Sequence, residues 1–369
     1  MLGTPHRLGI AEGIDGQVAE LIDDLDLSLV EDIAIEMPGW IGTTDVRETV
    51  RRFAFGESIA PETVLTDIAA AFSRQAAALG KLALYIVIPV MMSSFVSSTG
   101  MIGNVSNDLG RKLGLIVVLV PVVLSVTGEL EHVKDTITVT TERMNGILPI
   151  LLTLLIAVGG NASSAFLHPV VIAASGSMVY LAREVILRLV MCTCAVTTVN
   201  HLSDRVRLTR LARLLKSAVC WLLGVSFTVF LGAMSVQGVC SASIDGIMIR
   251  AAKYAVDNFV PVVGGMFSDT MDTLVGCTLI VKNALGVTAM LVLSGAMLMP
   301  MVRTLAVAAV MKFCAALLEP VALPEVIAAI EDFSGMLVLF LITMLCVCTM
   351  YFLLIVQMLL VGNLTVMLR

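Results

Sequence analysis

Long apolar stretches without a single charge dominate this chain from residue 82 onward. Met144–Ala182 contains 39 consecutive residues without Asp, Glu, Lys or Arg, Phe333–Leu368 contains 36, and Ser217–Ile244 contains 28. About 20 apolar residues in a helix cross the hydrocarbon core of a bilayer. Each stretch is therefore long enough to cross a membrane once, and the longest is long enough for two crossings.

The apolar pattern predicts about 8–9 helical membrane spans. They are expected at about 82–97, 113–128, 144–160, 165–182, 185–202, 217–238, 284–302, 304–318 and 336–361. Arg183, Glu184 and Arg188 separate the fourth span from the fifth. The predicted fold class is all-α, a polytopic helical membrane protein whose membrane domain covers residues 82–369.

Residues 1–81 have a different pattern, in which apolar residues recur at helical spacing among acidic ones. Leu21, Ile22 and Leu25 share one side of a predicted amphipathic helix. A second helix is predicted to begin at Pro61, because proline suits the first position of a helix. These residues predict a small amphipathic helical head. No basic segment followed by an apolar one marks a signal peptide at Met1.

The composition excludes several classes of protein. Apolar residues make up 58% of the chain, charged residues make up 14%, and the mean hydropathy is +0.98. Soluble domains contain about 25% charged residues, so a water-soluble enzyme is excluded. The net charge of −6 excludes a nucleic-acid partner. Most of the eight cysteines lie in apolar stretches without further zinc ligands, so neither a metal nor a cofactor is predicted.

Basic residues predict the orientation in the membrane. Ser203–Lys216 contains four arginines and one lysine against a single aspartate, which favours the cytoplasmic side. Counting spans from this loop places Arg111, Lys112, Arg303 and Arg369 on the same side. It places residues 129–143, Glu319–Gly335 and the acidic head outside. Because an external head normally needs an export signal, we expect the natural start to lie upstream of Met1.

The segment Ser241–Asn283 is too polar for a simple span and too apolar for a free loop. Arg250, Lys253 and Asp257 share one helical face, and Asp269 and Asp272 share another. Two interruptions separate these clusters, Pro261 and Gly264-Gly265. Charged residues near membrane depth tend to face a cavity or one another. Two interpretations stay open, a re-entrant or interfacial element lining a pathway and an amphipathic hairpin on the membrane surface.

A second interruption is predicted near the middle of the longest uncharged stretch. Gly159-Gly160-Asn161 is followed by His168-Pro169, a pattern typical of a helix break between two short spans. A single histidine in such a place is more often a hydrogen-bonded structural residue than a ligand.

Three segments resemble the stage III sporulation protein AE family of endospore-forming bacteria. They are GGNASSAFLHPV at 159–170, LGAMSVQGVCSASIDGIMIRAAKYAVDNFVPVVGGMFSDTMDT at 231–273 and GNLTVMLR at 362–369. The resemblance extends in order from about Met144 to Arg369. Shared positions include Asp245, Arg250, Lys253, Asn258, Pro261, Gly264, Asp269 and Asp272, and the family defines no catalytic residue.

The resemblance implies an integral protein of the mother-cell membrane that surrounds the forespore. It implies partners from the same sporulation operon, namely small membrane proteins, ring-forming subunits and a cytoplasmic secretion-type ATPase, in addition to membrane lipid. The predicted function is a non-enzymatic, membrane-embedded core component of a secretion-like channel complex needed for late forespore gene expression. The alternatives are a stand-alone secondary transporter with broken helices and a passive scaffold for ring subunits.

Overall fold

Long helices make up most of the structure. The computed structural model describes residues 16, 18–23, 30–31, 46–55, 61–98, 106–203, 208–259 and 264–367. Long single helices extend over Ser106–Ala157 (α6), Thr209–Phe259 (α9), Gly264–Leu318 (α10) and Pro324–Met367 (α11). Another long element consists of α7 (Asn161–Tyr180), the π-helical turn η2 (Leu181–Ile186) and α8 (Leu187–Leu202). The described residues contain no strand, and the predicted all-α class is confirmed.

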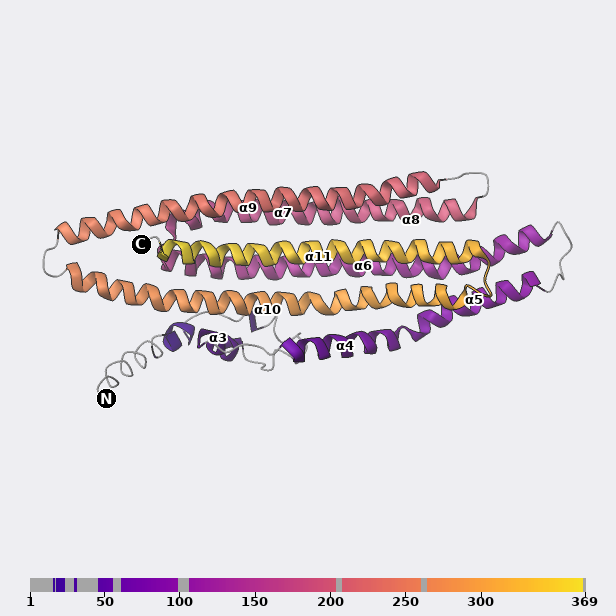
Figure 1. The fold of residues 1–369 in the computed structure, drawn as a ribbon, viewed down its shortest axis with the longest axis horizontal. Coiled ribbons are helices and arrows are strands. Elements are labelled where there is room, and N and C mark those ends of the chain that lie inside the picture. The colour runs from indigo at the N-terminus through magenta and orange to yellow at the C-terminus, as the bar shows by residue number, and fades with distance from the viewer. Residues whose placement is uncertain are drawn as a thin grey trace.

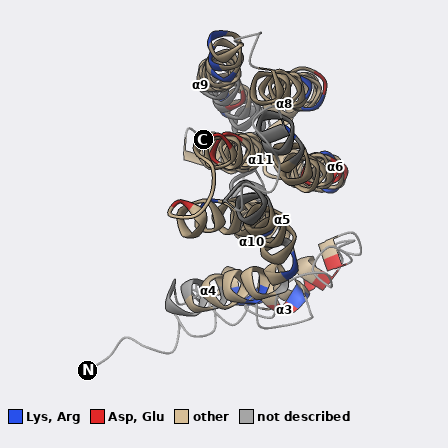
Figure 2. Ribbon diagram, turned by 90° about the vertical axis from the view of Figure 1, so that its right-hand side faces the viewer, with Lys and Arg blue, Asp and Glu red and all other residues tan. Residues whose placement is uncertain are grey.

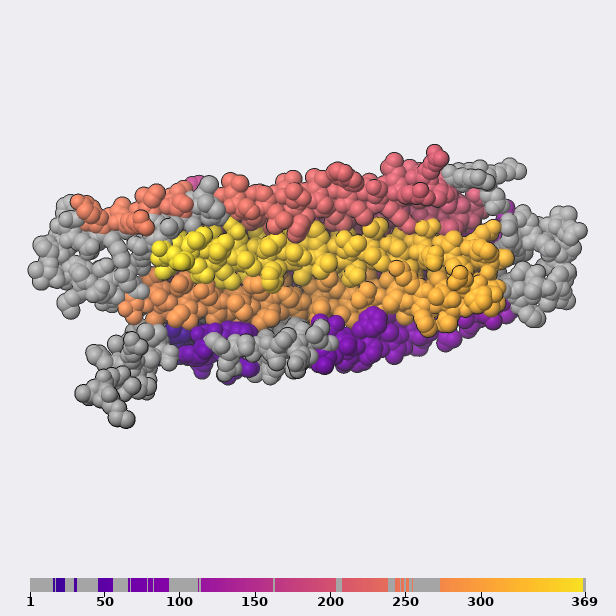
Figure 3. Space-filling view, viewed as in Figure 1, coloured from indigo at the N-terminus to yellow at the C-terminus, as the bar shows by residue number. Residues whose placement is uncertain are grey.

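These long elements lie side by side and alternate in direction along one axis (Figure 1). At one end of the bundle, named the Ser203 end, the chain reverses after Ser203 and again after Leu318. At the other, named the Gly159 end, it reverses at Gly159, and α11 ends nearby. α11 lies between α9 and α10, and α6 packs against both α10 and α11 (Figures 2 and 3).

Several predicted span boundaries do not correspond to helix ends. The spans expected at 113–128 and 144–160 belong to α6, and those at 284–302 and 304–318 belong to α10. The charged residues between them cost free energy in lipid, but they do not interrupt helical hydrogen bonding as proline or glycine can. Residues 129–143, predicted as an external loop, are consequently helical.

Five elements of the described part of the chain are long and apolar enough to cross a membrane. The candidate spans are Gly114–Ala157, Ser163–Leu202, Thr209–Gln237, Thr273–Leu318 and Pro324–Met367. At about 1.5 Å per residue, the 44 residues of α11 extend about 66 Å, twice the thickness of a bilayer core of about 30 Å. Each helix is therefore longer than a single crossing requires.

One layer of the bundle is uncharged on most of its helices. On α10, the 20 residues between Lys282 and Arg303 contain no Asp, Glu, Lys or Arg and extend about 30 Å along the axis. This length matches the thickness of a bilayer core. Residues 161–182, 217–244 and 333–367 on α7–η2, α9 and α11 are uncharged as well. The depth between Lys282 and Arg303 is named the charge-free layer.

The predicted placement of residues 203–216 and Glu319–Gly335 on opposite sides is wrong. Lys216 Nζ donates a hydrogen bond to Asp332 Oδ1 over 2.8 Å, which joins the two segments at the Ser203 end. The cause is the continuity of α10, which is one helix where two spans were predicted. The end of α11 likewise lies at the Gly159 end, away from residue 203 (Figure 1).

The head packs alongside α10. Its helices α3 (Val46–Ala54) and α4 (Pro61–Ala78) both contact α10, and α4 begins at the predicted Pro61. α3 buries Val46 and Val50. Arg47 Nε of α3 also forms an ion pair of 3.1 Å with Oε1 of Glu31, which precedes α3 in the head. α5 (Gly80–Ser98) follows α4 and packs against α6.

Candidate polar sites within the helical bundle

A buried carboxylate joins α9 to the start of α7. Asp245 is 1% exposed, and its Oδ2 accepts a hydrogen bond of 2.9 Å from the backbone N–H of Ser163. The first N–H groups of a helix have no intrahelical acceptor and favour a negative charge. Gly160, at the N-cap of α7, has no side chain to provide one. Asp245 therefore caps α7 from a neighbouring helix.

The turn before α7 requires its two glycines. Gly159 has a φ of 98°, which L side chains rarely adopt, and a Cβ at Gly160 would lie 2.8 Å from Leu155 Cδ1. The chain reverses at these residues. His168 and Pro169, also predicted as a break, instead lie inside α7, so that part of the prediction is wrong.

α7 accommodates its internal proline with help from α9. Pro169 lacks the N–H that would donate a hydrogen bond to the carbonyl of Ala165. The side chain of Gln237 on α9 donates a hydrogen bond of 3.0 Å to the next carbonyl, that of Phe166. A neighbouring helix thus supplies a polar contact one residue from the carbonyl that loses its donor, and α7 continues past Pro169.

Lys282 is a buried cation that the sequence reasoning missed. It is 1% exposed, and its Nζ donates to the carbonyl of Leu359 over 3.2 Å. Gly362 leaves the space for this side chain, because a Cβ there would collide with Nζ. Within the described residues, this lysine contacts no carboxylate. The available signal was its place as the charge that begins a 20-residue uncharged stretch.

A second buried carboxylate marks the other border of the charge-free layer. Glu129 is 4% exposed, and its Oε1 lies 3.4 Å from Arg303 Nε. Its Oε2 accepts a hydrogen bond of 3.1 Å from Thr304 Oγ1. These contacts fix the depth of α6 relative to α10, with Glu129 at the level of Arg303.

α6 carries charges inside the layer that α9, α10 and α11 leave uncharged. Tyr351 donates a hydrogen bond of 2.9 Å to Thr141 Oγ1, and Tyr351 lies eight residues, about 12 Å, from Leu359 on α11. Because Leu359 marks the level of Lys282, Glu142 lies about 12 Å inside the charge-free layer. Charged groups at such a depth face water or a polar partner rather than lipid.

Three carboxylates of α6 point outward. Glu131, Asp135 and Glu142 are exposed and share one helical face, at spacings of four and seven residues. We name these three residues the acidic stripe. Figure 2 shows charged residues on the side of α6 that faces away from α11. None of the three makes an ion pair with another described residue.

At the Ser203 end, Asp332 joins three helices. Its Oδ1 lies 2.8 Å from Lys216 Nζ on α9, and its Oδ2 lies 3.1 Å from His201 Nε2 on α8. Both contacts connect residues that are more than 100 positions apart in the chain. This cluster fixes the relative height of α8, α9 and α11.

Much of the predicted site in Ser241–Asn283 lies outside the described side chains. Its backbone forms the last part of α9 and the first part of α10, which begins at Gly264. Asp245 is buried and Arg250 is exposed. The side chains of Lys253, Asp257, Asn258, Asp269 and Asp272 lie outside the described residues, as does all of Pro261. Their shared faces and the re-entrant placement stay predictions.

No metal centre is built from the residues that the structure describes, which contain no group of three or more His, Cys, Asp or Glu side chains able to hold an ion. The polar sites above are instead structural contacts and one exposed acidic stripe. The acidic stripe is exposed and offers positions for contact with water, ions or partner proteins.

Comparison with known proteins decides the family. A model of the stage III sporulation protein AE family matches residues 45–362, from the residue before α3 in the head to near the end of α11. The chain belongs to this family. Stage III sporulation protein AE of Bacillus subtilis (strain 168) is 28% identical over 240 residues, which cover 65% of this chain and 60% of that relative. The match thus spans less than two thirds of that relative. No solved structure matches the chain.

The chain is thus a member of a family named for sporulation. The matched residues include Asp245, Lys282, Glu129 and the whole acidic stripe. These groups therefore lie in the part of the chain that the family model matches.

Proposed function

We propose that this protein is a membrane-embedded core component of the channel complex in the mother-cell membrane around the forespore. The acidic stripe of α6 is the observation that carries the proposal. It exposes three carboxylates at a depth where α9, α10 and α11 are uncharged and where the α7–η2–α8 element carries Arg183, Glu184 and Arg188, two of which form an ion pair with each other. A face of this kind is expensive in lipid and favourable against an aqueous conduit or a polar partner subunit.

The proposed role is non-enzymatic, in agreement with a family that is not known as an enzyme family. Its proposed partners are the other products of the same operon, including ring-forming subunits, small membrane proteins and a secretion-type ATPase on the cytoplasmic side. The proposed chemistry of this subunit is a polar, negatively charged wall rather than a reacting group.

The stand-alone transporter receives less support than the channel component. Transporters of that kind use helices broken near mid-membrane. α7 continues through His168 and Pro169, and Gly159-Gly160 joins the ends of two helices. A passive scaffold differs from the channel component in one respect, since it does not need the acidic stripe.

The experiment replaces Asp135 and Glu142 together by leucine in the full chain during sporulation. We expect the double leucine variant to insert into the membrane but to lose expression of a late forespore reporter. The reason is that leucine side chains cannot form hydrogen bonds with water or with polar partners. The matched control is Asp135→Asn with Glu142→Gln, which keeps the polarity and is expected to retain much of the reporter signal. Normal reporter expression in the leucine variant would contradict the proposal and favour the scaffold.

A further inference from the structure

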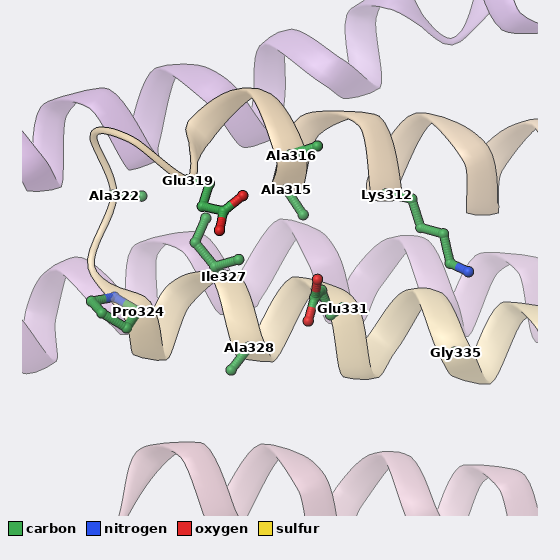
Figure 4. Close-up of a pocket in the computed structure, with 10 residues that line it drawn as sticks. All are labelled: Lys312, Ala315, Ala316, Glu319, Ala322, Pro324, Ile327, Ala328, Glu331 and Gly335. Atoms are coloured by element: carbon green, nitrogen blue, oxygen red, sulfur yellow. The ribbon is translucent and has the colours of Figure 1, made fainter.

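A cavity with unmatched charges opens between α10 and α11 at the Ser203 end. It has a volume of about 830 Å³, and alanines form much of its wall, among them Ala315, Ala322 and Ala328. Figure 4 shows Glu319, directly after the end of α10, and Glu331 of α11 pointing into the space between the two helices, with Lys312 of α10 at one side. The cavity thus combines small apolar walls with two carboxylates and one ammonium group.

The charges of this cavity are not neutralised within the described part of the chain. The side chains of Glu319, Glu331 and Lys312 make no ion pair or hydrogen bond with another described residue, and two acids face one base. The small side chains leave room for the close approach of another helix. The cavity therefore suits a helix that carries basic residues.

The chain itself presents such a helix on another side of the bundle. Arg210 and Arg213 are exposed on the first turns of α9 and likewise have no described partner. α11 lies between α9 and α10, so these arginines are kept from the cavity of their own copy (Figures 2 and 3). They are nevertheless at the same end of the bundle.

The ion pair between Lys216 and Asp332 fixes their relative height. Arg213 precedes Lys216 by three residues, about one helical turn, and Glu331 directly precedes Asp332. Copies of one membrane protein insert in the same orientation, since their topology signals are identical. When two copies stand side by side, the arginines of one are consequently level with the carboxylates of the other.

We propose that the cavity between α10 and α11 binds the basic first turns of α9 from a second copy of this chain. Arg210 and Arg213 of that copy then lie against Glu319 and Glu331. The two surfaces differ, so the contact is heterologous and leads to a row or ring rather than a closed pair. This inference goes beyond the proposed function and does not rest on it.

Disulfide cross-linking tests the contact in membranes. Two differently tagged full-length chains, each with its eight native cysteines replaced by alanine, are co-expressed, one with Glu331→Cys and the other with Arg213→Cys. We expect a cross-linked pair carrying both tags after mild oxidation. The matched control pairs Glu331→Cys with Leu202→Cys, which is also exposed at the Ser203 end but on α8, and we expect about tenfold less product.

Charge exchange gives an independent readout through co-purification of the tagged chains. Glu319→Lys with Glu331→Lys in both chains, or Arg210→Glu with Arg213→Glu in both, is expected to reduce co-purification about tenfold. When one chain carries the two lysine substitutions and the other carries the two glutamate substitutions, one complementary contact is restored. We expect co-purification to recover in this combination. Equal cross-linking of the control pair, or no recovery on charge exchange with normal insertion, overturns the proposal and assigns the cavity to another occupant. Neither readout depends on sporulation, so failure here is separate from failure of the proposed function.

Discussion

α6 and α9 both flank α11, but they expose opposite chemistry at the same depth. The outward face of α9 shows Val225, Val229 and Val236, all between 48% and 68% exposed. The outward face of α6 shows the acidic stripe. An apolar outer face suits lipid, and a charged one suits water or a polar partner. The bundle therefore has one flank suited to lipid and one suited to a conduit or a neighbouring subunit.

Hydrogen bonds to α11 establish that the two faces are level. Gln357 donates a hydrogen bond of 3.0 Å to the carbonyl of Met234 on α9, and Tyr351 donates one to Thr141 on α6. Gln357 lies six residues beyond Tyr351, so Val229 of α9 is close to the level of Thr141. Val229 and Glu142 thus lie at about the same depth.

The largest expected effect comes from moving a charge to the apolar flank. Val229→Asp puts a carboxylate on a lipid-facing surface, at a cost of about 2.5–3.5 kcal/mol for insertion at the helix centre. Val139→Asp puts the same group on α6 between Asp135 and Glu142, where we expect little change. The amount of each variant in washed membranes measures the difference, and equal losses would contradict the comparison.

A smaller effect is expected from the inward carboxylate of α9. Asp245→Leu leaves the N–H of Ser163 without its acceptor, and we expect a loss of about 1–3 kcal/mol in the free energy of unfolding. Asp245→Asn keeps a hydrogen-bond acceptor, so its loss in the free energy of unfolding should be smaller than that of Asp245→Leu. Ile247→Ala changes an exposed neighbour on the same helix and serves as control. Thermal unfolding of the purified protein in detergent provides the measurement, and identical stability of all three variants would refute the capping role.

The smallest effect concerns the bond that sets the depth of α6. Tyr351→Phe and Thr141→Val each remove one partner of the same hydrogen bond, and each is expected to cost about 0.5–1.5 kcal/mol. The double variant should cost less than the two single variants together, since both act on one contact. Strict additivity in the same unfolding assay would show that this bond does not hold α6 in register.

Much of the architecture follows from local sequence signals. Uncharged apolar stretches predict the membrane helices, Pro61 marks the start of α4, and Gly159-Gly160 marks a chain reversal. These signals work because helix ends and apolar segments depend on residues close together in the chain. The same local signals predict that spans end at charged residues such as Arg303 and Glu129. This prediction is wrong, because charged residues are tolerated inside a long helix where a neighbouring helix pairs them.

The polar contacts could not be predicted in the same way. Asp245 and Ser163 are 82 positions apart, and Lys282 and Leu359 are 77 apart. No periodicity indicates which of many distant helices will meet at such a residue. The acidic stripe was visible as charged residues, but its depth becomes apparent only when Thr141 is found against Tyr351.

The most direct test of the account measures what each flank touches in the membrane. A nitroxide label is attached to Glu142→Cys and, in a separate sample, to Val229→Cys, both in full-length chains without other cysteines and in lipid bilayers. The account predicts frequent collisions with lipid-dissolved oxygen at residue 229. At residue 142 it predicts few oxygen collisions, together with contact with a water-soluble nickel complex or with a protein neighbour. Equal, oxygen-dominated accessibility at both residues would contradict the claim that α6 turns its charges away from lipid.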